Sequence, residues 1–330
     1  MRMTDIVMST HCRLHRNLIK YPFVSGLNPE TGVEVTNDIL NAIDKHYSYE
    51  KVDLRDLSLY EIIKLKQSKL YSNELKNNER ISSVITIDDK RAVLVNEFDQ
   101  LVIASNRKGE NIETCLEDVM EISNNLEKDL DFAFDKRFGY LTTMPIICGT
   151  GIVFTIKLHL PGIRMHGYRN ILNELKSFGF ALIPKWDENN KMVGDIFYLT
   201  NTTAIGNTEE FLAQRLKNIL MRVKAYEEQF RYQYYVEDET TVVDKIYRSI
   251  GIAENARIIS EYEALDHLSN IKLGIDLNLI KSRFSTSVFE DMEKISASNL
   301  QMERGCVLDK KTRQKLRGDK LRKMVKERIV

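Results

Sequence analysis

Residues 138–163 read FGYLTTMPIICGTGIVFTIKLHLPGI and carry the clearest strand signal in the chain. Within this stretch, 151–161 is rich in β-branched and apolar residues and ends at Pro161, which predicts a β-strand. The turn Gly149-Thr150-Gly151 leads into it. Paired glycines let backbone N–H groups approach an anion, but a plain tight turn explains the same residues. The stretch therefore predicts a sheet strand with a candidate anion-binding turn at its start.

The flanking segments predict more strands and several helices. Residues 81–105 alternate around Asp88 and Asp89, which predicts a β-hairpin. Two short strands are expected at 180–184 and 194–203, joined by a polar loop. Helical periodicity is found at 31–50, 58–72, 111–135 (about six turns), 168–180 and 208–235. The chain through about residue 235 therefore reads as a mixed α/β body.

Beyond residue 236 the strand signal stops and short helices are expected, followed by a basic tail. Residues 301–330 hold eleven Lys or Arg against four Asp or Glu, a net charge of +7 that the first 300 residues balance with −7. The absence of aromatic residues between the charges disfavours a nucleic-acid-binding tail. A solvated basic helix explains the tail better than nucleic-acid binding does.

The composition is that of an ordinary soluble globular protein, with 43% hydrophobic and 29% charged residues. The four cysteines are scattered without a C-x-x-C pair, which predicts free thiols and a cytoplasmic location. No apolar run is long enough for a signal peptide or a membrane span. We therefore expect no membrane association.

The stretch MSTHCRLHRN, residues 8–17, is open to three interpretations. His11, Cys12 and His15 could bind a metal, but a closed site needs a fourth ligand and no second Cys/His cluster exists, so we expect no metal. The basic residues could instead cradle phosphate, or the stretch could end a surface helix. Farther along, Glu97 and Asp99 are expected on one face of a strand, where paired carboxylates could orient a cation.

Five motifs in order resemble the ATP:guanidino phosphotransferases, and most closely the bacterial protein-arginine kinases among them. DIVMSTHCRLHRNL is similar to the family's D-I-V-L-S-S-R-x-R-L-A-R-N, and VNEFDQLVIA to N-E-E-D-H-[LI]-R-I. The stretch 138–163 resembles G-Y-L-T-S-C-P-T-N-x-G-T-G-L-R-A-S-V-x-x-H-L-P, and VGDIFYLTN resembles V-G-N-I-F-x-I-S-N. Residues 246–281 resemble the kinases' C-terminal domain, with its Y-R-S-x-G and L-G-I-D-L-G-I-I.

The resemblance implies an α+β fold: a guanidino-kinase-type, antiparallel-rich sheet flanked by helices over 1–235, then an all-helical C-terminal domain over 236–330. It implies ATP and Mg as cofactors if the chain is active, and otherwise none. The residues that it carries over as catalytic are Glu97, Asp99 and Glu188. Those that it suggests for nucleotide binding are Ser9, His11, Arg13, Arg16, Gly149, Gly151, Lys157 and Lys185.

Several positions depart from the family pattern. His11 stands where the first phosphate-binding arginine is expected, and Met144 where the reactive cysteine is expected. Other phosphate-binding arginines fall at Val102, Val153 and Ile183, and the substrate-gripping glutamate falls at Phe98. Two lysines lie on the same strand faces as missing arginines. Lys185 is displaced from position 183 by roughly 7 Å, and Lys157 is displaced from position 153 by roughly 13 Å, so they replace the arginines poorly.

In the tail, RQKLRG at 313–318 resembles the kinases' phosphoarginine-binding R-D-x-x-R-A, with Arg313 and Arg317 matching. Two hypotheses follow. In the first, the chain is a degenerate homologue, a pseudokinase, that binds proteins or phosphoarginine. In the alternative, it is an active protein-arginine kinase with a diverged site. Partners are expected to be proteins, arginine-phosphorylated ones among them, and a second copy in a homodimer.

Overall fold

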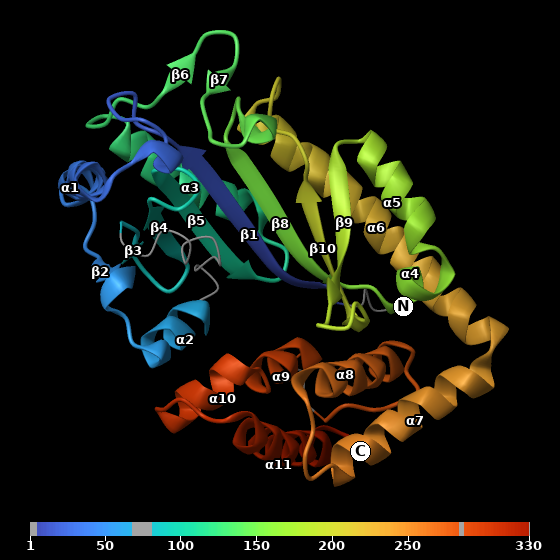
Figure 1. The fold of residues 1–330 in the computed structure, drawn as a ribbon. Coiled ribbons are helices and arrows are strands. Elements are labelled where there is room, and N and C mark those ends of the chain that lie inside the picture. The colour runs from blue at the N-terminus through green and yellow to red at the C-terminus, as the bar shows by residue number, and fades with distance from the viewer. Residues whose placement is uncertain (1–4, 68–80, 284–286, 330) are drawn as a thin grey trace.

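The computed structural model describes residues 5–67, 81–283 and 287–329. Its centre is an eight-stranded sheet in the order β2-β3-β4-β5-β1-β8-β10-β9 (Figure 1). Its strands are β1 (Val7–Arg16), β2 (Glu50–Asp53), β3 (Ser83–Thr86), β4 (Arg91–Val95), β5 (Leu101–Lys108), β8 (Ile152–His159), β9 (Phe180–Trp186) and β10 (Met192–Asn201). Every neighbouring pair is antiparallel, and β6 (Phe134–Asp135) pairs separately with β7 (Gly139–Tyr140).

Helices cover one face of the sheet and extend beyond one of its ends. The longer helices are α1 (Pro29–Ile43), α2 (Leu59–Gln67), α3 (Ile112–Leu126), α5 (Tyr168–Ser177), α6 (Glu209–Glu237), α7 (Glu239–Asn255), α8 (Glu261–Asp276) and α11 (Lys310–Arg328). Shorter ones are α4 (Pro161–His166), α9 (Val288–Lys294), α10 (Ala297–Arg304), η1 (Val24–Gly26), η2 (Leu54–Asp56) and η4 (Pro145–Ile147). The predicted fold class, an α+β body followed by a helical region, is confirmed.

Three local expectations were wrong or incomplete. Residues 8–17 lie mostly in β1, a central strand, and not at a helix end. The helix expected over 111–135 ends at Leu126, because the chain then turns back and Ala133 N donates to Asn17 O at 2.7 Å. The hairpin over 81–105 is two successive hairpins, β3–β4 and β4–β5. The helix expected over 58–72 is α2, and residues 68–72 lie outside the described part.

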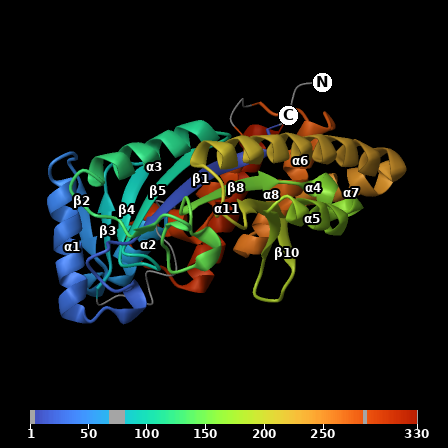
Figure 2. The same cartoon turned by 90° about the horizontal axis from the view of Figure 1, so that it is seen from above.

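The main core lies between the sheet and helices α1, α3, α5 and α6. Figure 2 shows α3 and α6 running over the same face of the strands. Inward-facing residues such as Leu14, Phe154 and Ile103 are completely buried there. We call the opposite side the second face of the sheet. Strand alternation directs His11, Arg13 and His15 toward it.

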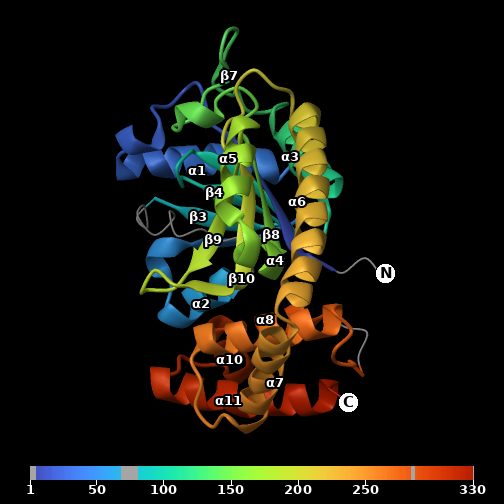
Figure 3. The ribbon, with the colours of Figure 1, turned by 90° about the vertical axis from the view of Figure 1, so that its right-hand side faces the viewer.

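The C-terminal helices pack beyond one end of the sheet through α8, which contacts β10 (Figure 3). Met8, Val193 and Ile196 of the sheet share a core with Leu265 and Leu268 of α8. The predicted division into 1–235 and 236–330 falls close to the break between α6 and α7 and stays a prediction. The contact between the two parts has the apolar character of a domain interior.

Two buried polar networks cross this junction. In the first, Ser269 links His159 Nε2, at 2.8 Å, to Asp195, which also accepts from Arg164 at 2.5 Å. Burial holds the pKa of His159 well below its ordinary value, so this imidazole is neutral at pH 7. The network therefore ties β8 and β10 to α8 with a neutral histidine and one carboxylate.

The second network centres on Glu227 and Arg231 of α6. Glu227 accepts from Gly162 N at 3.0 Å and Ile163 N at 2.8 Å, and Arg231 Nε donates to it at 3.0 Å. Arg231 also donates to Asp276 of α8 at 2.8 Å. Burial raises the pKa of Glu227 to about 7. A Cβ on Gly162 would lie 2.4 Å from Arg231 N, so only glycine permits this approach of α4 to α6.

Among the described residues, none of the helices has the length and apolar character that crossing a bilayer requires.

Candidate functional site

The predicted nucleotide residues of β1 and β8 lie together on the second face. Arg13 is opposite Val153, His11 is opposite Thr155, and Ser9 is opposite Lys157. Ser9 Oγ lies 3.2 Å from His11 Nε2. Strand alternation thus brings Ser9, His11, Arg13 and Lys157 to one surface, with Val153 beside Arg13 at one end of the row.

Glu97 and Asp99 lie in the tight turn between β4 and β5, and the expectation that they share a strand face was wrong. Asn96 has φ 55°, and the backbone bonds across the turn from Asn96 N to Gln100 O. Glu97 Oε1 accepts from Arg13 at 3.1 Å. The turn therefore aims Glu97 at the second face, while Phe98 between the carboxylates is 40% exposed.

Asp99 is completely buried and holds three donors. It accepts from His15 Nδ1 at 2.9 Å, Asn17 Nδ2 at 2.6 Å and Thr143 N at 2.7 Å. Burial opposes ionisation of Asp99, but these hydrogen bonds outweigh it and keep the pKa of Asp99 below its ordinary value. His15 is thereby oriented by an ionised carboxylate, the usual arrangement for a histidine that accepts protons.

Sequence reasoning missed His15, Asn17 and Thr143 as members of this cluster. A signal existed for His15, since it stands at the alanine of the family's R-L-A-R-N and two residues after Arg13. The zinc alternative for the same stretch fails on geometry: Cys12 points into the main core, away from His11 and His15. Within the part of the chain that the structure describes, no cluster of three metal-ligating side chains is found.

Arg16 is not on the second face but under the glycine turn. Its guanidinium is buried, donates to His15 O at 2.9 Å and Thr150 O at 2.8 Å, and stacks 3.4 Å above the Tyr140 ring. Burial lowers the pKa of Arg16 to about 10. At pH 7 Arg16 is still charged, and it stabilises the turn through these contacts.

The glycine turn is packed tightly against β1. Gly151 has φ 68°, and a Cβ there would lie 2.5 Å from His15 O. Gly149 N donates to Tyr140 O at 3.1 Å and Gly151 N to Ile147 O at 3.0 Å. Both N–H groups are thus used within the protein.

The three apolar replacements have different surroundings. Val102 is completely buried in a small cluster with Leu54, Val84 and Leu94. Val153 is half-buried, and Ile183 on β9 is 47% exposed. Lys185, two residues after Ile183, is half-buried, and burial lowers its pKa against the opposing effect of Glu261.

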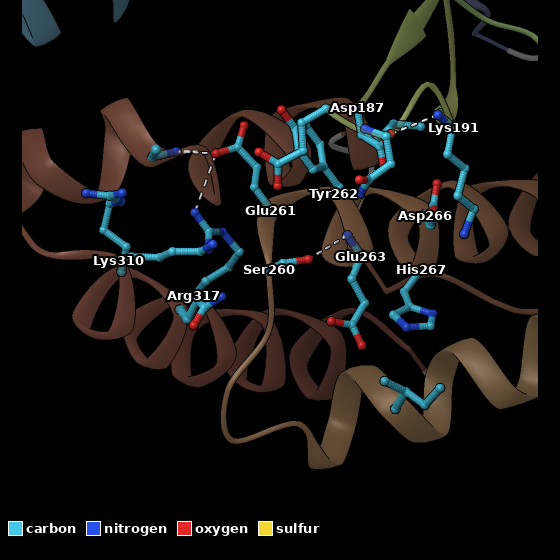
Figure 4. Close-up of a pocket in the computed structure, with 17 residues that line it drawn as sticks. Asp187, Lys191, Ser260, Glu261, Tyr262, Glu263, Asp266, His267, Lys310 and Arg317 are labelled. Atoms are coloured by element: carbon cyan, nitrogen blue, oxygen red, sulfur yellow. Dashed lines mark hydrogen bonds and ion pairs between the residues drawn. The ribbon is translucent and has the colours of Figure 1, made fainter.

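Glu188 lies apart from Glu97 and Asp99. It is in the β9–β10 turn, where Asp187 Oδ1 accepts from Asn189 N and Lys191 N, both at 2.8 Å. This turn forms one wall of a cavity of about 730 Å³, whose other walls are mainly α8 and α11, with Ile252 of α7 and Ala297 of α10 completing the lining (Figure 4). The structure thus brings Glu188 together with the tail arginines.

Arg313 and Arg317 both line that cavity, one turn apart on α11. Arg317 is buried, and its guanidinium donates to Ile295 O at 2.8 Å and Ile259 O at 3.2 Å and pairs with Glu261 at 3.4 Å. Arg313 donates to Leu308 O. Figure 4 shows Lys310 and Arg317 on α11, with Glu261 and Glu263 on the neighbouring helix.

Comparison with known proteins agrees with this geometry. Residues 32–230 match the family model of the ATP:guanido phosphotransferase C-terminal catalytic domain, and residues 239–328 match that of the protein-arginine kinase McsB C-terminal domain. The protein-arginine kinase of Syntrophomonas wolfei is 31% identical over 327 residues, 97% of this chain and 91% of that protein. That of Clostridium acetobutylicum is 30% identical over 302 residues, 90% and 86% of the two chains.

Solved structures support the fold. Lombricine kinase is similar with a TM-score of 0.59 at 16% identity, over 68% of this chain and 66% of that one. The duplicated taurocyamine kinase from Schistosoma mansoni gives 0.58 at 22% identity, over 67% and 33%. With both domain models matched in order and relatives aligned over nearly the whole length, the chain belongs to the protein-arginine kinase McsB family of ATP:guanido phosphotransferases.

Proposed function

We propose that this chain is a protein-arginine-kinase homologue with a degenerate phosphotransferase site, and that it acts by binding proteins. The supporting observation is the second face of the sheet. Val102, Val153 and Ile183 stand where the family resemblance expects arginines, and the Arg16 guanidinium is bonded to His15 O and Thr150 O. The charged side chains that remain there do not fit a tightly held ATP–Mg complex.

The size of the expected loss follows from the chemistry of phosphoryl transfer, which depends on positioning and on cations around the phosphates. Removing one such electrostatic contact typically costs about 10²–10³ in rate. The three apolar replacements are expected to remove most of the rate acceleration of phosphoryl transfer, even if their effects are strongly non-additive. Of the arginines that the resemblance assigns to phosphate binding, Arg13 is half-exposed on the second face within the described residues. Its side chain is paired with Glu97.

A second candidate function, active protein-arginine kinase, has its own support. The relatives aligned above are protein-arginine kinases, and by themselves they favour this alternative. Within the chain, Asp99 orients His15 beside the Arg13–Glu97 pair. A histidine so held could take the proton that Phe98 cannot accept, so the diverged centre still offers a base.

The deciding experiment incubates the purified chain with ATP, Mg and a basic protein, and measures phosphoarginine under conditions that preserve acid-labile phosphate. The Clostridium acetobutylicum kinase serves as the positive control. We expect phosphoarginine at least about 10³-fold below that control, because several phosphate contacts are missing. ATP-dependent phosphoarginine that disappears in His15→Ala and Glu97→Ala would overturn the degenerate interpretation and establish the alternative.

For the partner, we propose a phosphorylated arginine on another protein, held in the cavity between the β9–β10 turn, α8 and α11. Support comes from its mixed charge: Lys310 and Arg313 can face a phosphate, and Glu261 and Glu263 can face a guanidinium. Arg317 contributes by holding Glu261 and the ends of α8 and α9. Gln314, in place of the family's acid, removes one charged acceptor.

Titration of a phosphoarginine peptide tests this partner. Arg313→Ala is expected to weaken binding about tenfold, because a charge-assisted hydrogen bond to phosphate is lost. Lys311→Ala, exposed on the same helix outside the cavity, is the matched control and should bind like the unchanged chain. If the unchanged chain, Arg313→Ala and Lys311→Ala bind the peptide with equal affinity, the cavity is not the binding site for phosphoarginine.

The predicted homodimer stays a prediction. Many apolar residues of the C-terminal helices, among them Ile246, Leu268 and Leu273, are buried in the chain's own core and cannot form such an interface. Its support now comes from other side chains of the same region, since Tyr247 and Ile258 are each 55% exposed.

A further inference from the structure

The cavity between the β9–β10 turn, α8 and α11 has room for more than one side chain of a ligand. Its volume of about 730 Å³ lies in the range of pockets that hold a drug-sized molecule. The phosphate and the guanidinium of phosphoarginine are placed above at Lys310 and Arg313 of α11 and at Glu261 and Glu263, at the start of α8. The rest of the lining is thus available to a different part of the ligand.

Three carboxylates form much of this remaining lining, which we call the acidic wall: Asp187 and Glu188 of the β9–β10 turn and Asp266 of α8 (Figure 4). Asp187 Oδ1 accepts from Lys191 N at 2.8 Å, which closes the turn on itself. Asp266 Oδ1 accepts from Gly194 N of β10 at 2.6 Å, which joins α8 to the strand next to the turn. These two hydrogen bonds give the acidic wall a defined place in the folded chain.

The surroundings of the acidic wall favour an added positive charge. Lys191 is the cation that this wall itself contributes to the lining. Burial and the nearby Asp195 raise the pKa of Asp266, although a backbone N–H and neighbouring cations oppose the shift. Burial also lowers the pKa of His267 in the same lining, so His267 is neutral at pH 7. A ligand cation beside Asp266 would therefore be stabilised.

We propose that the acidic wall contacts the residue next to the phosphoarginine, and that the cavity prefers peptides in which this neighbour is lysine or arginine. The preference rests on the phosphoarginine binding proposed above and specifies the class of peptide. One side of the cavity is basic through Lys310 and Arg313, and the acidic wall lies on different elements. Such a separation of charge selects a ligand with a phosphate and a further cation, and disfavours an acidic neighbour.

Titration of the full chain with three peptides tests this preference. Each peptide carries one phosphoarginine, flanked on both sides by lysine, by alanine or by glutamate. At low ionic strength the lysine peptide is expected to bind about fivefold tighter than the alanine peptide, the gain of a partly exposed ion pair, and the glutamate peptide more weakly than either.

A matched pair of substitutions assigns the preference to the acidic wall. Glu188→Lys should bring the affinities for the lysine and alanine peptides to within about twofold of each other. Glu228→Lys makes the same chemical change at an exposed position of α6 outside the cavity, and should keep the fivefold difference. A difference that persists in Glu188→Lys, or that disappears equally in both variants, would overturn the assignment.

Failure of phosphoarginine binding itself gives a different result, because the alanine peptide would then bind the unchanged chain and Arg313→Ala equally. If the alanine peptide depends on Arg313 but lysine adds no affinity in the unchanged chain, phosphoarginine binding stands and the preference for a basic neighbour is refuted. The lysine peptide without its phosphate should bind at least about tenfold more weakly than the phosphorylated form. Equal binding of these two forms would also refute the proposal, since general charge attraction would then explain the gain.

Discussion

Arg231→Met is expected to lower the free energy of unfolding by about 3–5 kcal/mol, because it breaks a buried ion network by removing one partner. The Arg231 side chain is 4% exposed and joins Glu227 of α6 to Asp276 of α8. Methionine fills similar volume but leaves the completely buried Glu227 without its cation. Lys272 still neutralises Asp276, so the loss is concentrated on Glu227.

Urea unfolding at pH 7 measures this effect, and Arg248→Met is the matched control. Arg248 also pairs with an acid four residues away, Asp244, but both side chains are mostly exposed. Solvent screens such a pair, so the control should change little. Similar losses of unfolding free energy in Arg231→Met and Arg248→Met would show that the buried network at the junction stabilises the chain no more than an exposed ion pair does.

Asp99→Ala is expected to cost about 3 kcal/mol or more, because it leaves three buried donors without their acceptor. These donors are His15 Nδ1, Asn17 Nδ2 and Thr143 N, from two different segments of the chain. Asp89→Ala, in the exposed β3–β4 turn, removes a carboxylate of the same size and should change stability little. A loss no greater than that of the control would mean that water replaces Asp99 at no cost.

The same variant has a defined pH dependence. The pKa of folded Asp99 lies below its ordinary value of 3.8, so its contribution to stability is present above about pH 4. It is lost as the pH falls through the lowered pKa of the folded state. The difference between the unchanged chain and Asp99→Ala should therefore shrink in acid, and a difference that grows below pH 4 would contradict the assignment of an ionised Asp99.

Regular periodicity and motif order predicted the framework well. The strand expected over 151–161 is β8 (Ile152–His159), and the helix expected over 208–235 is α6 (Glu209–Glu237). Thr208 caps that helix, accepting from Phe211 N. These elements are set by local patterns of apolar side chains and by a capping residue, which a single sequence displays directly.

The candidate site was less predictable, because its contacts join distant residues. The turn that aims Glu97 at Arg13 depends on Asn96 adopting a positive φ, and no periodicity signals that. The family motif singles out Arg317, but no local pattern predicts that its side chain is buried. Its burial depends on carbonyl groups of Ile259 and Ile295, which become neighbours only in the folded chain.

The hydrogen bond from His159 to Ser269 has a consequence for building chimaeras from this family. A gene that joins the sheet of this chain to the C-terminal helices of a relative would place the relative's own residue, in place of Ser269, opposite a completely buried imidazole. His159 Nδ1 already lacks a hydrogen-bond partner, so losing the Nε2 partner as well would leave both ring nitrogens unsatisfied. The two modules are thus interchangeable only if the residues at 159, 195 and 269 are transferred as one set.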